Sequence, residues 1–286
     1  MTRYLIAGAA GMLGRDLQRA LTGRDVTALS RAELDIVDGD AVEAAVAGHD
    51  VILNAAAFTN VDDAEVHEAA AYAINARGVE NLAVAAARTG ARLVTISTDY
   101  VFHGDAREPY PEEATRDPIN AYGRSKAAGE GLALARHPEG TTVIRAAWLY
   151  GANGPNFVRT ILRLTRERET ISVVSDQLGQ PTWTRDLAEQ IVGMLDAGAP
   201  AGVYHGTNGG SATWFELARA TLELAGLDPG RIQETRSEHL ARRAPRPSYS
   251  VLGHDRWTRE GLAPMRPWQD ALAEAWASDT FTEGLR

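Results

Sequence analysis

The chain has 286 residues, of which 44% are hydrophobic, so it is long and apolar enough to bury one core and a smaller lobe. Its net charge of -9 disfavours nucleic acids and anionic membranes as partners, and no apolar run is long enough to cross a bilayer. Cysteine is absent and the seven histidines are scattered, so we expect no disulfide and no metal site. No secretion signal precedes the first predicted strand, so we expect a cytoplasmic location.

The N-terminal segment predicts a strand, a glycine turn and a helix in that order. An apolar run at 4–7 is followed by glycines spaced GxxGxxG, and apolar residues then recur at helical spacing. Glycines in such a turn let the backbone approach a pyrophosphate, whose charge is favourable at a helix N-terminus. We therefore predict a dinucleotide site with contacts from Gly8, Gly11, Met12, Leu13 and Gly14.

The second predicted strand, at 26–29, ends where dinucleotide folds often carry an acidic residue for the adenosine ribose. Ser30 and Arg31 stand there instead, and a hydroxyl beside a guanidinium suits a 2'-phosphate. The sequence thus favours NADPH as the cofactor, and NADH is the alternative if Arg31 is only solvated. We expect Asp35 and Ile36, a few residues later, to flank the adenine.

Two more strands are predicted before residue 100. The run at 51–53 leads into small residues, and we expect Ala57, Phe58 and Thr59 to lie against the cofactor. The run at 92–96 ends in hydroxyl residues, at the position where open α/β sheets bind ligands. An alanine-rich helical stretch at 65–89 separates these strands, and the alternation predicts an α/β fold with a doubly wound, Rossmann-like parallel sheet.

Lys126 is the only lysine among 29 basic residues, and it follows Tyr122 by four positions. On a helix this spacing places the ammonium group beside the phenol on one face. A nearby cation lowers the pKa of a tyrosine, which makes the phenol usable as a general acid or base. Because arginine differs from lysine in shape and reach, a lone lysine here indicates a chemical role; the alternative is a surface helix with one stray lysine.

The second half predicts a smaller, discontinuous lobe. Apolar spacing indicates a helix at 186–197, a strand at 202–205 and a helix at 213–224. We expect the first two of these to return to the sheet. The predicted domains are therefore a dinucleotide-binding domain of residues 1–147 plus about 186–206, and a substrate-binding lobe of about 148–185 and 207–286.

Several motifs occur in a specific order along the chain. They are the glycine turn, Asn-Ala-Ala-Ala at 54–57, Ser-Thr-Asp-Tyr-Val-Phe at 97–102, Tyr-x-x-x-Lys at 122–126, Trp-Leu-Tyr-Gly at 148–151, Asp-Gln-Leu-Gly-Gln-Pro-Thr at 176–182 and Arg-Pro-Ser-Tyr-Ser at 246–250. Together they resemble the extended short-chain dehydrogenase/reductases that act on nucleotide sugars. The resemblance is closest to the dTDP-4-dehydrorhamnose reductase family, and it covers almost the whole chain.

The resemblance implies an NADPH-dependent reductase of the 4-keto group of a dTDP-4-dehydro-6-deoxysugar, above all dTDP-4-dehydro-L-rhamnose. It implies that Tyr122 protonates the ketone oxygen and that Thr98 hydrogen-bonds the same oxygen. Lys126 would hold the nicotinamide ribose and lower the pKa of the tyrosine.

The same resemblance implies a set of substrate contacts. The sugar pocket would be lined by Val61, Asp99, Tyr100 and Trp148, although Trp148 has core packing as an alternative. Arg246 would hold the diphosphate, since guanidinium groups bind phosphate oxygens in pairs. The side-chain amides of Asn156 and Gln177 would serve the pyrimidine or the pyrophosphate.

Differences from similar enzymes favour net reduction over dehydration or epimerisation of the sugar. Similar sugar 4,6-dehydratases carry Asp-Glu where this chain has Asp99-Tyr100, and 4-epimerases typically carry serine at the position of Thr98. Two alternatives remain. One is a 4-ketoreductase for another dTDP-deoxysugar of an antibiotic pathway, including a dihydrostreptose-type product. The other is a non-catalytic protein like the regulatory subunit of methionine adenosyltransferase, against which the intact catalytic trio argues.

Some members of the family dimerise through a magnesium ion held by surface carboxylates. The matching positions here are Asp16 and Arg185, and an arginine cannot ligate a cation. We therefore expect no metal, and either a monomer or a homodimer.

Overall fold

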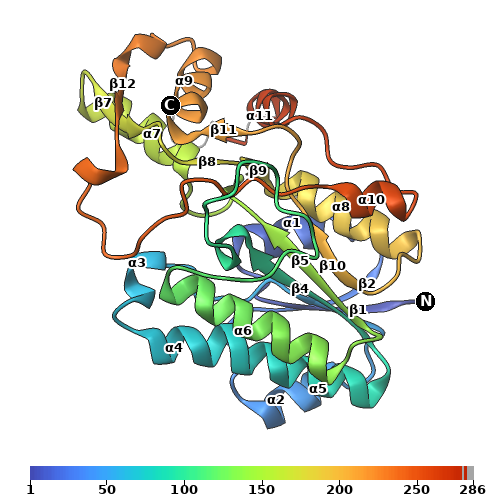
Figure 1. Cartoon of the computed structure of the whole chain (residues 1–286). Helices are drawn as coiled ribbons and strands as arrows, with labels where there is room; N and C mark the ends of the chain where they lie inside the picture. The colour runs from blue at the N-terminus through green and yellow to red at the C-terminus, as the bar shows by residue number, and fades with distance from the viewer. Residues whose placement is uncertain (279, 282–286) are drawn as a thin grey trace.

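A computed structural model of the chain describes residues 1–278, 280 and 281. Six parallel strands form a central sheet in the order β10-β5-β4-β3-β1-β2, with helices on both faces (Figure 1). The strands are β1 (Arg3–Ala7), β2 (Asp25–Leu29), β3 (Val51–Asn54), β4 (Arg92–Thr98), β5 (Thr141–Ala146) and β10 (Gly202–His205). The chain moves from β1 to β2 on one side and then to β3 on the other, so the strand order reverses between β1 and β3. This is the doubly wound sheet that the sequence predicted.

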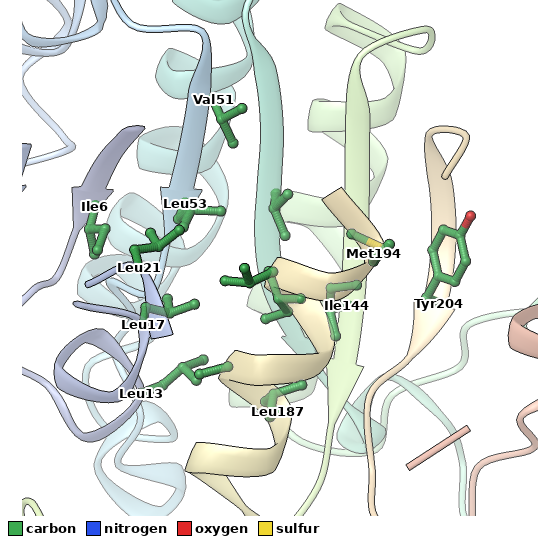
Figure 2. Close-up of a cluster of buried hydrophobic side chains, with 14 of the residues drawn as sticks. Ile6, Leu13, Leu17, Leu21, Val51, Leu53, Ile144, Leu187, Met194 and Tyr204 are labelled. Atoms are coloured by element: carbon green, nitrogen blue, oxygen red, sulfur yellow. The ribbon is translucent and has the colours of Figure 1, made fainter. Parts of the chain in front are cut away.

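Helices cover both faces of the sheet because its strands are apolar on both sides. The helices are α1 (Met12–Ala20), α2 (Gly39–Val46), α5 (Val79–Thr89), α6 (Ala121–Arg136) and α8 (Thr184–Asp196). On one face, Leu17 of α1 and Leu187 of α8 pack in one cluster with Ile144 of β5 (Figure 2). On the other face, α2 and α5 enclose a second apolar cluster, which also includes Ala133 of α6. No helix among the described residues is both long and apolar enough to span a membrane.

The rest of the second half builds a lobe beside this sheet unit (Figure 1). Its helices are α7 (Phe157–Glu167), α9 (Trp214–Leu224) and α11 (Trp268–Ala277). Its paired short strands are β6 (Leu149–Tyr150) with β9 (Thr182–Trp183), β7 (Ile171–Val174) with β12 (Ile232–Thr235), and β8 (Leu178–Gly179) with β11 (Ala212–Thr213). The lobe has two apolar clusters of its own, and Leu149 of β6 packs against the cluster on the sheet.

Part of the predicted lobe belongs to the sheet unit. Trp257, in the short helix α10 (Asp255–Arg259), packs against Tyr204 with ring centroids 4.9 Å apart. Its indole N–H also donates a hydrogen bond to the His205 carbonyl oxygen at 2.7 Å. Helix α10 therefore contacts the sheet unit, although it lies within the range of about 207–286 that was predicted for the lobe. Residues 279 and 282–286 of that range lie outside the described part of the chain.

The helical stretch predicted at 65–89 is broken. It contains the short helix α4 (Glu68–Tyr72), a π-helical turn (Ala73–Gly78) and α5, and α3 (Val61–Ala64) precedes it. The turn places Asn75 so that its side chain accepts a hydrogen bond from the Phe58 N–H at 2.8 Å and donates one to the Phe58 carbonyl at 3.0 Å. The irregular turn thus fixes the loop after β3, which was expected to lie against the cofactor.

Candidate active site

A cavity of about 640 Å³ opens at the point where the strand order reverses. It is lined by the turn after β1, the loop after β3 and the end of β4, and the lobe contributes residues from the opposite side. Open α/β sheets bind ligands at such a switch point. The predicted site residues that line it are Gly11, Met12, Leu13, Ala57, Thr59, Val61, Thr98, Asp99, Tyr100, Tyr122, Lys126 and Trp148.

Helix α6 carries Tyr122 and Lys126 to this cavity. Asn120 caps the helix, and its side chain accepts a hydrogen bond from the Gly123 N–H at 2.7 Å. Glycine is required at 123, because a Cβ atom there would lie 2.1 Å from the Tyr100 carbonyl oxygen. The helix therefore packs closely against the segment that follows β4, which brings the phenol and the ammonium group to the same cavity as Thr98.

Burial sets the protonation of these groups. It raises the pKa of Tyr122 to about 12, a hydrogen bond with the Thr98 side chain partly lowers it, and the charge of Asp99 raises it further. The Lys126 ammonium donates a hydrogen bond to the Ile96 carbonyl at 2.5 Å, and burial lowers the pKa of Lys126 to about 8. In the protein without ligands, Lys126 therefore does not lower the pKa of Tyr122 as the sequence led us to expect. The phenol keeps its proton at neutral pH, as a proton donor requires.

Asp99 is buried, with 2% of its surface exposed, and lines the same cavity. Its Oδ1 accepts a hydrogen bond from the Thr98 hydroxyl at 2.9 Å. Its Oδ2 accepts none, although the Ser250 hydroxyl is close enough to lower the pKa of the carboxyl. Burial outweighs these contacts and raises that pKa to about 6. Asp99 therefore places a carboxyl group beside Thr98 in the lining of the cavity.

The N-terminus of α1 fits the pyrophosphate of a dinucleotide. Its N-cap, Gly11, supplies no side-chain hydrogen bond and its first turn has no acidic residue, so backbone N–H groups remain available beside the cavity. Gly8 has a positive φ of 81°, and a Cβ atom there would lie 2.6 Å from the Ala56 nitrogen. A Cβ atom on Gly14 would lie 2.3 Å from the Gly8 carbonyl oxygen. Gly8 and Gly14 therefore shape the turn without lining the cavity.

The turn after β2 differs from the expectation. The Gly8 and Ala9 N–H groups both donate to the Leu29 carbonyl at 3.0 Å, so this turn lies beside the glycine turn. The Ser30 hydroxyl and N–H both donate to the Glu33 carboxylate, at 2.7 Å and 2.8 Å. The hydroxyl that was expected to meet a 2'-phosphate is therefore already engaged, while Arg31 is exposed.

Three other predicted cofactor contacts lie outside the cavity lining. Ile36 is buried in the core under α5 and packs against Gly78, so its side chain does not line the cavity, and its place beside an adenine stays a prediction. Asp35 is exposed, and its carboxylate accepts a hydrogen bond from the Val37 N–H at 3.0 Å. Phe58 contributes its backbone to the contact with Asn75, and its ring packs beside Tyr122 in a small apolar cluster.

The predicted substrate ligands outside the cavity have structural partners. Asn156 caps α7, since its side chain accepts a hydrogen bond from the Arg159 N–H at 3.0 Å. The two terminal guanidinium nitrogens of Arg246 donate to the carboxylate of Asp62 at 2.8 Å, and this ion pair lowers the pKa of that carboxyl. Gln177 is buried and hydrogen-bonded within the lobe. The local sequence could have identified the Asn156 cap, because asparagine directly precedes a helix there.

Trp148 lines the cavity beside a second tryptophan that the sequence did not indicate as a site residue. The Trp148 and Trp214 rings are stacked, with centroids 3.6 Å apart and planes 8° apart. Trp214 is the first residue of α9 and follows the capping residue Thr213. Its sequence neighbours indicate only a helix start, so no local signal connects it to the cavity.

The positions matched to a metal site have other contacts. Asp16 is buried, accepts a hydrogen bond from the Thr184 hydroxyl at 2.6 Å and has a pKa raised by burial. Arg185 pairs with Glu189 at 2.9 Å. Within the described part of the chain, no group of three or more His, Asp or Glu side chains is arranged to hold a metal ion.

Comparison with known proteins identifies the family. The model of the RmlD substrate binding domain matches residues 2–280. A dTDP-4-keto-6-deoxy-D-glucose reductase of Streptomyces niveus is 50% identical over 96% of both chains, and a dTDP-4-dehydrorhamnose reductase of Streptomyces griseus is 49% identical over 96% of this chain and 92% of its own. The crystal structure of dTDP-4-dehydrorhamnose reductase from Bacillus anthracis in complex with NADP is 39% identical, with a TM-score of 0.93 over 97% of this chain and 100% of that one. The chain belongs to the RmlD family, that of the dTDP-4-dehydrorhamnose reductases.

Proposed function

We propose that this protein reduces the 4-keto group of a dTDP-4-dehydro-6-deoxysugar with NADPH, and that dTDP-4-dehydro-L-rhamnose is the substrate. The observation that carries this proposal is the single cavity shared by Thr98, Tyr122, Lys126 and the N-terminus of α1. A proton donor and an anion-binding helix end thus open onto the same space. The relatives named above support the substrate class.

In this proposal NADPH supplies the hydride, and the protein supplies orientation and the proton. The turn at Gly11 to Leu13 binds the pyrophosphate with backbone N–H groups. Tyr122, protonated at neutral pH, donates its proton to the ketone oxygen. The Thr98 hydroxyl, whose proton the Asp99 carboxylate accepts in the structure, turns from that carboxylate to donate a hydrogen bond to the ketone oxygen. Lys126 supplies a positive charge and a donor for the ribose hydroxyls. Asp99 accepts a hydrogen bond from a sugar hydroxyl.

The main alternative is another dTDP-deoxysugar. A probable dTDP-4,6-dihydroxy-2-methyloxan-3-one 4-ketoreductase of Streptomyces antibioticus is also 50% identical over 96% of this chain, so identity alone does not separate the substrates.

We also propose that the protein acts as a monomer or homodimer, without a nucleic acid or membrane partner. NADPH carrying deuterium at both positions of the nicotinamide C4 tests the reaction. Deuterium at C4 of the sugar product supports the proposal, and oxidation without deuterium transfer to C4 contradicts it.

The activity should fall as the pH rises through about 8. Lys126 has its pKa lowered to about 8, so it is charged below that value and loses its charge above it. Tyr122, with a pKa raised to about 12, stays protonated over the same interval and adds no second transition. Measuring kcat/KM from pH 7 to pH 10 checks this, because kcat/KM reports the pKa of the free enzyme. The residual activity of a Lys126→Met variant should lack the transition, and a wild-type rate that is constant to pH 10 would contradict the assigned role.

Replacing Glu33 should change the cofactor preference. The Glu33 carboxylate occupies both Ser30 donors, so a 2'-phosphate must displace it and meets its negative charge, whereas the 2'-hydroxyl of NADH does not. A Glu33→Gln variant keeps an acceptor for Ser30 and removes the charge. We expect the Kd of NADPH to fall about three- to tenfold relative to that of NADH at low salt. Cofactor fluorescence gives both values. Asp40→Asn, which removes an exposed charge from the first turn of α2, serves as the control. An unchanged ratio in Glu33→Gln would mean that Glu33 only caps the turn.

A further inference from the structure

Two indole rings from distant parts of the chain form one wall of the active-site cavity. Trp148 follows β5 and Trp214 begins α9, and their rings stack at 3.6 Å while both line the cavity. Both side chains are only partly buried although both elements are well packed. Aromatic rings that could be fully buried but remain open to a cavity provide apolar surface for a ligand.

The backbone and its surroundings hold Trp148 in an unusual conformation. Its φ of 45° makes it the one residue other than glycine with a positive φ among those the structure describes. A bulky side chain rarely adopts this region, and such strain is concentrated at functional sites. The indole also requires glycine at position 179, where a Cβ atom would lie 2.6 Å from the ring. The lobe is therefore built around this orientation of the ring.

A chain of hydrogen bonds fixes the second indole. The Trp214 indole N–H donates to Gln177 Oε1 at 3.2 Å, and Gln177 Nε2 donates to the Ser237 hydroxyl oxygen at 2.8 Å. Ser237 in turn donates from its hydroxyl and its N–H to the Asp176 carboxylate, at 2.7 Å and 3.0 Å. Gln177 was expected to contact the nucleotide, but both its amide oxygen and its amide nitrogen take part in these hydrogen bonds. It therefore orients Trp214.

We propose that Trp214 is a substrate-specificity residue that, with Trp148, binds the apolar side of the 6-deoxyhexose, and that Gln177 is its positioning residue. This proposal rests on the proposed function, because it assigns the sugar of that substrate to this wall. A 6-deoxyhexose carries a methyl group where an ordinary hexose carries a hydroxymethyl group, so it offers more apolar surface to a pair of indoles. Thr98, Asp99 and Tyr122 supply the polar contacts of the same cavity.

Binding without turnover tests the proposal. Titration calorimetry gives the Kd of dTDP, dTDP-L-rhamnose and NADPH for the wild type and for Trp214→Leu, Trp214→Phe and Gln177→Leu. We expect Trp214→Leu to weaken dTDP-L-rhamnose about tenfold, with dTDP and NADPH unchanged within about twofold. Trp214→Phe retains a ring and should lose less. Gln177→Leu should also weaken the dTDP-sugar selectively. Gln190→Leu, which removes a half-buried glutamine on α8 that lies outside the cavity lining, is the matched control and should change none of the three constants.

The outcomes separate the alternatives. Equal weakening of dTDP and dTDP-L-rhamnose would place the indoles against the nucleotide and overturn the proposal. Unchanged dissociation constants in all three variants would mean that Trp148 and Trp214 only pack against each other, and this would also overturn the proposal. If Trp214→Leu does not fold, as judged by its melting temperature, Trp214→Phe and Gln177→Leu decide. Failure of the wild type to bind either dTDP compound would contradict the proposed function itself, which is a different result.

Discussion

Replacing Lys126 with methionine should lower kcat about a thousandfold, because the proton donor Tyr122 and the cofactor ribose lose their only neighbouring ammonium group. Methionine has a similar length and suits a residue that is 4% exposed, so the fold should be retained. Arginine at the same position should also inactivate the protein. Its planar fork is larger than the ammonium group that donates to the Ile96 carbonyl.

Steady-state kinetics with saturating NADPH and substrate check this prediction, together with the melting temperature of each variant. Arg124→Met is the matched control, since it removes an exposed cation from the same helix. It should retain nearly the full rate. A Lys126→Met protein with a rate near that of the wild type would remove lysine from the proposed mechanism.

Replacing Arg145 with methionine should lower the free energy of unfolding by about 3–5 kcal/mol, because it leaves a buried carboxylate without its main partner. Arg145 and Glu130 are 3% and 2% exposed, and the guanidinium donates to both carboxylate oxygens of Glu130, the closer contact being 2.8 Å. The Ser97 hydroxyl and Arg116 also contact Glu130, so the loss should fall at the lower end of this range.

Urea unfolding measures the effect. The double variant Arg145→Met/Glu130→Leu removes both charges, so we expect it to regain most of the lost stability. Arg136→Met is the control, because its ion pair with Glu80 is exposed on the arginine side and should contribute less than about 1 kcal/mol. If Arg145→Met were as stable as the wild type, the buried pair would not stabilise the end of β5.

Arg145 also illustrates what the sequence could not predict. Strands β1 to β4 are apolar runs followed by glycine, asparagine or hydroxyl residues, and they were predicted within two residues. Strand β5 was missed, because an arginine inside a short apolar run contradicts the pattern of a strand buried on both faces. The arginine is tolerated only because Glu130 of α6 faces it, and that contact becomes visible only in the folded chain.

In the candidate active site, too, features with a local sequence signal were predictable and features that depend on long-range contacts were not. The placement of Tyr122 and Lys126 on one helix beside the cavity was predictable because helical spacing is local, and their catalytic role stays a prediction. The glycine turn was identifiable because it lies between a strand and a helix. The ion pair of Arg246 with Asp62 and the stack of Trp148 with Trp214 depend on long-range contacts, which no local pattern encodes. Asn156 caps α7, which its position directly before a helix could have indicated, and its role as a ligand stays a prediction.

The most direct test of the proposed function is NADPH oxidation, followed at 340 nm, with dTDP-4-dehydro-6-deoxyglucose in the presence and absence of a separate 3,5-epimerase. The proposal predicts turnover only when the epimerase supplies dTDP-4-dehydro-L-rhamnose. Turnover without the epimerase would assign the protein to a different deoxysugar. No oxidation under either condition, with a folded protein that binds NADPH, would contradict the reductase assignment.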